Sequence, residues 1–349
     1  MNMLAQLSPF AEFVLFSAIK IICVFSVLMF IVAYAVWVER KVSAAIQDRH
    51  GPNRVGLFGL LQPAADALKA FLKEDFTPAH VRKAYFWLAP AIVMIPSLLT
   101  VAIIPFGSQL RGEKMVIADL NVGILYTFGI VSLGVYGIVL AGYAANSKYP
   151  FLGGIRSSAQ MISYEIAMGM SVIPVFLLVG GLNLSQVIEY QTGSIFHWLI
   201  FKQPLAFAIF LAAMFAETNR LPFDLPESEQ ELAGGYNVEY SSIKFALFFM
   251  GEYAAMTAAC AMMVTLFLGG WTLPFAGLDQ PAENIGIGLL QVGIFLAKML
   301  FVEFMVIWVR WMWPRFRYDQ LMDLGWRRFI PLALFNIVAT AVVLWAVTK

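Results

Sequence analysis

Six carboxylates crowd a single connection between two apolar segments, ETNRLPFDLPESEQELAGGYNVEY at residues 217–240. They are Glu217, Asp224, Glu227, Glu229, Glu231 and Glu239, and Arg220 is the one basic residue among them. The chain has only 22 acidic residues, so this connection holds more than a quarter of them. Acidic side chains contribute little to the orientation of a membrane protein. Their density here therefore indicates proton or cation handling at a membrane surface.

Five ionisable residues lie inside apolar segments: Lys20, Glu165, Glu252, Lys298 and Glu303. Each costs roughly 2.5–3.5 kcal/mol at the centre of a lipid-facing helix, so each must face other helices, a partner or water. Lys20, Lys298 and Glu303 are compatible with snorkelling or structural roles. Glu165 and Glu252 have no basic residue within a helical turn. We predict that these two relay protons, the alternative being that they are satisfied polar groups.

Eight apolar segments must position these carboxylates. The composition is 60% hydrophobic and 13% charged with a mean hydropathy of +0.77, and each segment can cross a hydrocarbon layer of ~30 Å. This predicts an all-α polytopic membrane protein, a single membrane domain over 1–349. The first segment lacks a preceding basic cluster and a cleavage site, which favours a retained helix. The segments lie at about 13–38, 84–104, 122–144, 159–180, 198–216, 241–268, 285–309 and 329–347.

The basic residues predict the orientation of these segments. The loops after the first, third, fifth and seventh segments hold seventeen Lys and Arg residues, whereas the opposite loops and tail hold four. Basic residues concentrate on the cytoplasmic side. Both termini are therefore expected outside the cytoplasm, and the loops at 39–83 and 217–240 inside it. The net charge of +1 gives no reason to expect a nucleic-acid partner.

The loop at 39–83 contains a predicted amphipathic helix of about 15 residues, too short to span a membrane. Its apolar face would carry Leu57, Leu60, Leu61, Ala64, Leu68, Phe71 and Leu72, and its polar face Gln62, Asp66, Lys69 and Lys73. Such a helix should lie in the membrane interface. It would serve either as a surface anchor or as a doorway for a lipid-soluble molecule.

Motifs for bound cofactors are missing from the sequence. There is no GxxxxGK[ST] phosphate loop, and GIG at 286–288 lies in an apolar segment. Cys23 and Cys260 stand apart, so neither a zinc site nor an iron–sulfur cluster is expected. We therefore predict no metal and no cofactor bound by this chain itself.

Several long motifs together carry a resemblance to a known family. They are WVERKVSAAIQDRHGPNRVGLFGLLQPAADALKAFLKE, SYEIAMG, AETNRLPFDLPESEQELAGGYNVEYSS, FFMGEYAAM and WPRFRYDQLM. They resemble the H-type membrane subunit of proton-pumping NADH:quinone oxidoreductase, respiratory complex I, whose mitochondrial counterpart is NADH dehydrogenase subunit 1. The resemblance extends from about Phe13 to Trp345.

The resemblance implies a membrane subunit of the respiratory chain that forms part of a quinone chamber and couples quinone reduction to proton translocation. Quinone would be the substrate, while FMN, NADH and iron–sulfur clusters would belong to partner subunits. Those partners would be the iron–sulfur and quinone-module subunits of the peripheral arm and the small and antiporter-like subunits of the membrane arm. The protein would lie in the bacterial inner membrane.

The resemblance also assigns roles by residue. It implies a proton relay through Glu165, Glu217, Asp224, Glu227, Glu229, Glu231 and Glu252. The quinone chamber would be bordered by Arg40, Arg49, Asp66, Lys69 and Arg220. Supporting members would be Glu39, Arg156, Glu239 and Arg310.

Two other classes of protein stay open from the residues alone. A related membrane subunit serves membrane-bound hydrogenases, in which no quinone need bind. A secondary transporter would use the carboxylates as a cation site, although such proteins commonly show internal repeats and none is clear here. Iron–sulfur subunits that co-purify with the chain would exclude the transporter, and activity that depends on NADH and quinone would exclude the hydrogenase.

Overall fold

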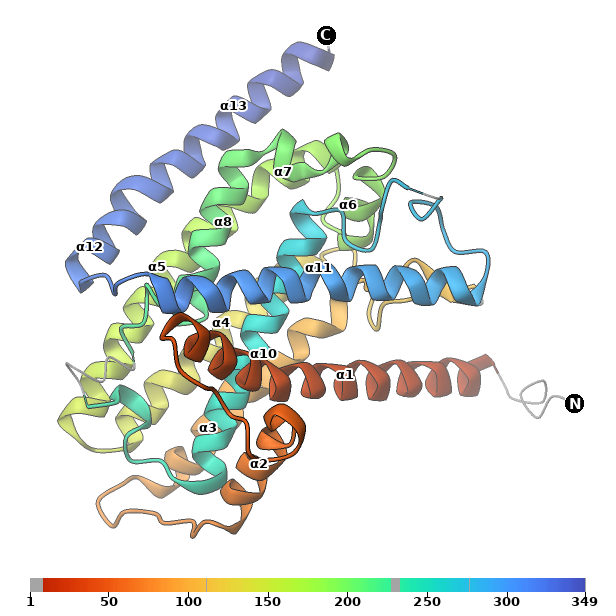
Figure 1. Ribbon diagram of the computed structural model, residues 1–349. Coiled ribbons are helices and arrows are strands. Elements are labelled where there is room, and N and C mark those ends of the chain that lie inside the picture. Colours follow the sequence, from red (N-terminus) through yellow and green to blue (C-terminus); the bar gives the residue numbers. More distant parts are fainter. Residues whose placement is uncertain (1–8, 111, 227–232, 276, 349) are drawn as a thin grey trace, which may run out of the picture.

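A computed structural model describes residues 9–110, 112–226, 233–275 and 277–348 (Figure 1). Glu227, Glu229 and Glu231 of the acidic connection lie outside the described residues. Helices dominate the described part, and its two-residue strands β1 (Gln109–Leu110) and β2 (Glu113–Lys114) pair antiparallel. The α-helices are α1 (Pro9–Ile46), α2 (Gln62–Leu72), α3 (Lys83–Thr100), α4 (Gly123–Ala144), α5 (Lys148–Val179), α6 (Leu184–Tyr190), α7 (Leu199–Lys202), α8 (Pro204–Glu217), α10 (Ser242–Phe267), α11 (Ile285–Met312), α12 (Tyr318–Asp323) and α13 (Ile330–Thr348).

Seven helical runs within the described residues are long and apolar enough to cross a membrane. They are α1, α3, α4, α5, α10, α11 and the run from α12 to α13, so the predicted all-α polytopic class is confirmed. The segment expected at 198–216 differs, because it is divided into α7 and α8 at Gln203. Proline has no amide hydrogen and disfavours helix at the preceding residue, so Pro204 begins a new helix. With 14 residues, α8 is about 21 Å long.

Helix α5 is longer than its apolar pattern predicts, because it begins at Lys148. Ser147 precedes it in an extended conformation, and Pro150 stands in its first turn, where a missing amide hydrogen is tolerated. The polar residues that follow conceal this part of the helix from a hydropathy reading. They place Arg156 on the same rigid helix as Glu165.

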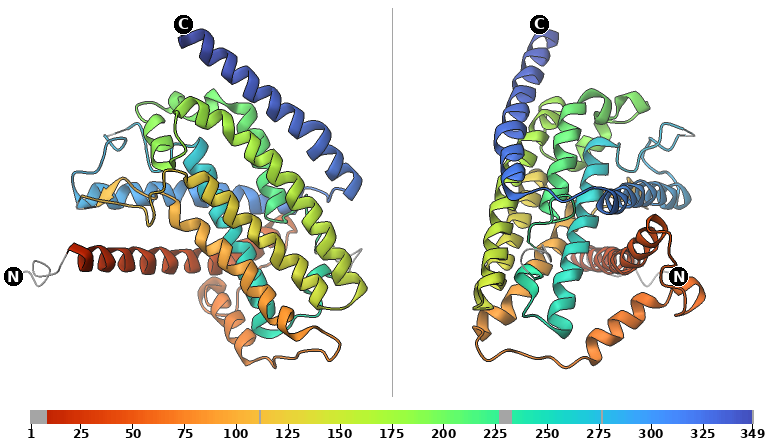
Figure 2. Two further views of the ribbon diagram at one scale, coloured as in Figure 1. Left: turned by 180° about the vertical axis from the view of Figure 1, so that it is seen from behind. Right: turned by 60° about the vertical axis from the view of Figure 1, so that its left-hand side comes forward.

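The long helices form two groups that meet at α10. Helices α1 and α11 run side by side in the same direction and cross α10 (Figures 1 and 2). On its other side, α10 contacts α3 and α8, and the succession α3, α4, α5, α8 packs neighbour to neighbour. Helix α13 packs on α5 and α8 and extends past them in both views. The largest buried apolar cluster draws on both groups, so α10 joins them into one body.

Helix α2 lies where the amphipathic helix is predicted, although it has 11 residues instead of about 15. Its apolar residues Leu68, Phe71 and Leu72 point outward and are 59%, 71% and 79% exposed. Asp66, on the inward side, accepts hydrogen bonds from Arg40 and Gln62. Asp66 and Gln62 therefore face the chain, whereas Lys69 and the apolar residues of α2 are exposed.

Lys298 closes the end of α10 from within α11. Its ammonium donates hydrogen bonds to the carbonyl oxygens of Leu268 (2.7 Å), Gly270 (3.0 Å) and Thr272 (2.7 Å), and it lies 4.3 Å from the centre of the Trp198 ring. The last carbonyls of a helix lack partners within the helix, and a cation there also complements the helix dipole. These bonds give Lys298 a structural role in place of snorkelling.

We expect Lys298→Met to destabilise the assembled protein by at least about 2 kcal/mol, because three buried carbonyls lose a charged donor. The measurement is the temperature at which the purified complex loses this subunit. Lys202→Met is the control, since the exposed Lys202 ammonium only approaches the Tyr190 ring and hydroxyl. If both variants and the parent protein lose this subunit at the same temperature, the Lys298 hydrogen bonds contribute nothing to stability.

Candidate functional site

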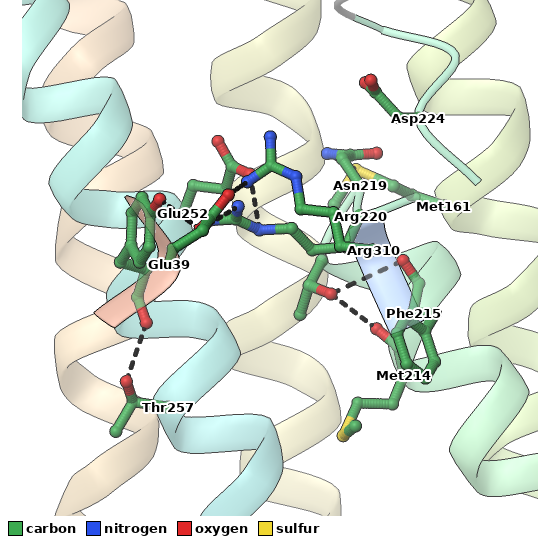
Figure 3. A network of polar contacts seen from close by, with 12 residues as sticks. Glu39, Met161, Met214, Phe215, Asn219, Arg220, Asp224, Glu252, Thr257 and Arg310 are labelled. Atoms are coloured by element: carbon green, nitrogen blue, oxygen red, sulfur yellow. Dashed lines mark hydrogen bonds and ion pairs between the residues drawn. The ribbon is translucent and has the colours of Figure 1, made fainter. Parts of the chain in front are cut away.

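The buried guanidinium of Arg220 joins carboxylates from two different helices (Figure 3). Its Nη1 lies 3.3 Å from Oε2 of Glu39 on α1, and its Nε lies 2.9 Å from Oε1 of Glu252 on α10. Arg310 on α11 also binds Glu39, through Oε1. We refer to Glu39, Arg220, Glu252 and Arg310 as the Arg220 network. It consists of two cations and two anions contributed by four segments.

Helix ends position the members of this network. Glu39 and Arg310 lie toward the ends of α1 and α11, which run in the same direction, and Arg310 stands in the last turn of α11. Arg220 follows α8 by three residues and enters from the acidic connection. Glu252 lies in the first half of α10, the helix that both groups share. Partners separated by as many as 271 residues therefore meet at one end of the helix bundle.

Tyr253 completes the surroundings of Arg220. Its hydroxyl donates a 2.6 Å hydrogen bond to Oε2 of Glu39, and its ring lies 4.2 Å from the Arg220 guanidinium carbon. Arg220 is 2% exposed. Burial alone would lower the pKa of Arg220, but the neighbouring Glu252, Tyr253 and Glu39 raise it above its ordinary value. Arg220 is therefore a permanent positive charge that favours the ionised forms of the nearby carboxylates.

Glu217 and Glu252 line the same partly open cavity, of about 100 Å³, between α3, α4, α5, α8 and α10. A cavity needs roughly 10–15 Å³ to hold one water, so this one has room for several. Glu217 is 8% exposed, and neither of its carboxylate oxygens has a hydrogen-bond partner among the described residues. Buried polar atoms are rarely left in this state, so Glu217 is suited to exchanging a proton through the cavity.

Two further carboxylates lie near this cavity and the network. Glu165, half-buried on α5, interacts electrostatically with Glu217. Glu303, buried on α11, accepts a hydrogen bond from Thr257 at 3.3 Å and interacts electrostatically with Arg220. Glu165 therefore neighbours Glu217, Glu217 shares the cavity with Glu252 of the Arg220 network, and Glu303 lies near Arg220.

The acidic connection is fastened to the bundle at its first residues. Asp224 Oδ2 lies 2.7 Å from Nη2 of Arg315, and the Phe316 amide donates a 3.0 Å hydrogen bond to the Pro222 carbonyl. The side-chain amide of the buried Gln160 donates to the carbonyls of Ala216 (2.7 Å) and Phe223 (2.6 Å). Asp224 is thus paired with Arg315.

Four of the five predicted chamber residues lie around the first connection, whereas the fifth, Arg220, lies in the Arg220 network. Arg40 Nη1 lies 2.7 Å from Asp66, and Lys69 lies 3.8 Å from the same carboxylate. Arg40, Arg49, Arg54 and Gln62 line an open hollow of about 740 Å³. Its basic lining suits a polar or anionic headgroup.

The two remaining predicted residues stand outside the Arg220 network. Glu239 lies 3.7 Å from the ring Nε2 of His80. Arg156 is half-buried in α5.

Tyr253, Glu303 and Arg315 were not predicted as site residues. Tyr253 follows Glu252 directly, but a helical neighbour ordinarily points elsewhere, so its sequence position gave no signal. The signal for Glu303 was its place in an apolar segment, the same criterion that selected Glu165 and Glu252. Arg315 was counted only for orientation. Across the described residues, no group of three or more His, Cys, Asp or Glu side chains could hold a metal ion.

This architecture defines a polytopic helical membrane protein with a buried carboxylate–arginine site at one end of its bundle. The family model for NADH dehydrogenase matches residues 19–341. The chain belongs to this family, as an H-type subunit of NADH-quinone oxidoreductase, part of an oxidoreductase complex. Membership implies assembly with the other subunits of that complex. Together with the apolar helices, it indicates a multi-pass inner-membrane protein.

Relatives match the chain over almost its whole length. An H-type subunit of the NADH-quinone oxidoreductase of Cytophaga hutchinsonii is 47% identical over 336 residues, covering 94% of this chain and 96% of that protein. The corresponding protein of Flavobacterium johnsoniae is 45% identical, covering 96% of each chain. The corresponding protein of Paramagnetospirillum magneticum is 49% identical, covering 97% of this chain and 95% of its own.

Proposed function

We propose that this subunit forms part of the wall of a quinone chamber and couples quinone reduction to proton translocation through its carboxylates. The observation that carries the proposal is the position of Arg220. It leaves the acidic connection, binds Glu39 and Glu252 in the bundle, and lies beside the cavity that reaches Glu217. A single buried charge therefore links the loop near the proposed chamber to carboxylates deep among the helices.

Coupling would work through charge. An iron–sulfur cluster of a peripheral-arm subunit would supply two electrons to the quinone, and the reduced quinone would take up two protons. The resulting change of charge alters the proton occupancy of the acidic connection. Arg220 stays positively charged and favours the ionised forms of Glu252 and Glu39. The changed charge of the acidic connection alters how strongly Arg220 stabilises those ionised forms. Water in the cavity would then carry protons between Glu252, Glu217 and Glu165. Such a set titrates together, so no member has a pKa of its own.

The headgroup of the quinone would lie near the basic hollow, and its tail near α2. Arg40 holds α2 through Asp66, while the outward Leu68, Phe71 and Leu72 provide an apolar surface for the membrane interface. With α7 and α8 counted together as an eighth crossing, the orientation predicted from the basic residues would put this end of the bundle in the cytoplasm, against the quinone-module subunits, and both termini in the periplasm. The small and antiporter-like membrane subunits would receive the protonic signal from the Glu165 side.

The test is to replace Arg40 or Arg49 by Ala in the assembled enzyme. We expect quinone reduction to fall about tenfold, equivalent to ~1.4 kcal/mol, because a charged donor at the chamber is lost. NADH oxidation by a hydrophilic artificial acceptor should continue, since it bypasses the chamber. The matched control is Arg317→Ala, which removes an exposed guanidinium paired with Asp319 on the same side of the bundle. Full quinone reductase activity in both test variants would refute the proposed chamber wall.

A further inference from the structure

A second cavity opens between α1, α10 and α11, and its lining includes Thr257, the hydrogen-bond partner of Glu303 beside the Arg220 network. Its volume is about 500 Å³, which lies within the ~300–1,000 Å³ of typical ligand sites. Its walls are almost wholly apolar and include Val24, Leu28, Phe295 and Met299. On α1 and α11 its lining extends from Phe16 to Ile31 and from Ile285 to Met299, whereas Glu39 and Arg310 lie nearer the last residues of these helices. The cavity is therefore separate from the proposed chamber.

A single ion pair supplies the charge in the lining of this cavity. Lys20 Nζ on α1 lies 3.3 Å from Oε2 of Glu113 on β2, and the two side chains are 19% and 54% exposed. The remaining lining residues are uncharged. A cation and an anion thus stand together beside an apolar cleft. This pattern matches the chemistry of an amphipathic ligand that carries both charges at one end.

The length of the cleft also matches such a ligand. From Lys20 to Ile31 its wall on α1 is about 16 Å long at ~1.5 Å per residue, and Phe16 and Ile19 extend it beyond Lys20. Half of a ~30 Å hydrocarbon layer is about 15 Å, the depth of one leaflet. The charged pair and the apolar wall are therefore spaced as the headgroup and acyl chain of a leaflet lipid are.

We propose that this cleft binds one phospholipid with a zwitterionic headgroup that contains a primary ammonium. The phosphate accepts hydrogen bonds from Lys20, the headgroup ammonium donates to Glu113, and an acyl chain fills the apolar cleft. A partly exposed ion pair contributes only about 0–1 kcal/mol, so inserting the headgroup between Lys20 and Glu113 costs little. An anionic headgroup would satisfy Lys20 but repel Glu113. An uncharged quinone would leave both unpaired with the ligand.

Cys23 reports on occupancy, because it lines the cleft and is exposed, whereas Cys260 is buried. The experiment measures alkylation of Cys23 by N-ethylmaleimide in the delipidated, assembled complex, using mass spectrometry of the Cys23 peptide. The complex is then supplied with phosphatidylethanolamine or with phosphatidylglycerol at equal mole fraction. We expect phosphatidylethanolamine to slow alkylation roughly tenfold, as about nine-tenths occupancy would, and phosphatidylglycerol to slow it much less.

Variants at the pair make the test specific. Glu113→Gln should remove the difference between the two lipids, because it removes the carboxylate that binds the ammonium and repels an anionic headgroup. Lys114→Gln should preserve the difference, since Lys114 adjoins Glu113 in sequence but does not line the cleft. Equal protection by both lipids in the parent protein would overturn the proposal. So would a Cys23 that stays unreactive after delipidation, which would indicate a protein neighbour over the cleft. Protection by a long-tailed quinone in lipid-free detergent, equal to that by phosphatidylethanolamine, would assign the cleft to quinone instead.

Discussion

Arg220→Met is expected to abolish quinone reduction and to lower the amount of assembled complex. The substitution keeps an unbranched side chain but leaves the carboxylates of Glu39 and Glu252 buried without the cation between them. Breaking a buried ion pair by removing one partner costs about 3–5 kcal/mol. The measurements are the content of this subunit in membranes and the quinone reductase rate per assembled complex. Arg310 still binds Glu39, so most of the cost should fall on Glu252.

A double variant separates stability from coupling. Arg220→Met combined with Glu252→Gln removes one uncompensated charge, so assembly should recover in part while turnover stays low. Arg327→Met is the matched control, because this arginine is exposed and its pair with Asp323 should contribute only about 0–1 kcal/mol. If Arg220→Met assembles and turns over as the parent protein does, the network has no part in coupling.

Glu217→Gln and Glu252→Gln are each expected to reduce proton-coupled turnover about a hundredfold, within the range attributed to positioned proton-transfer groups. Glutamine preserves the shape of glutamate but cannot alternate between charged and neutral forms. The two residues line the same cavity, so either change should interrupt the same path. The measurement is quinone reduction together with proton uptake in sealed vesicles, normalised to assembled complex. Glu165→Gln is expected to act in the same direction.

The control for these variants is Glu283→Gln, which neutralises an exposed carboxylate in the connection before α11. It should leave turnover and proton uptake unchanged. Glu217→Gln should also leave assembly intact, because its oxygens have no hydrogen bonds to lose within the described part of the chain. Normal proton uptake in both Glu217→Gln and Glu252→Gln would show that these carboxylates have only a structural role.

Hydropathy predicted most of the helices because their apolar residues must match a hydrocarbon layer, a constraint visible in any one segment. It misjudged α5, where Ser147 and Pro150 mark the start of the helix more faithfully than polarity does. It also merged α7 and α8, because an apolar pattern does not register the break that Pro204 imposes. Local capping and proline chemistry would have corrected both errors.

The pairing within the site could not be predicted from spacing. Glu39 and Arg220 are 181 residues apart, and Tyr253 reaches Glu39 across 214. Burial of Glu165 and Glu252 followed from their apolar neighbours, but the helix of Lys298 alone left a structural role and snorkelling both open. Its three carbonyl partners belong to the turn after α10, which a single helix does not reveal.

The attachment of Asp224 to Arg315 and of Pro222 to Phe316 has a mechanical consequence. These contacts clamp the beginning of the acidic connection to the strap between α11 and α12. If the acidic connection moves, the strap must move with it, or the Asp224–Arg315 ion pair and the Phe316–Pro222 hydrogen bond must break together. The strap continues through α12 into α13, which packs on α5 and α8 along the outside of the bundle. We therefore expect a movement of the acidic connection to be transmitted through α12 and α13 to the outside of the bundle, where a neighbouring subunit would contact α13.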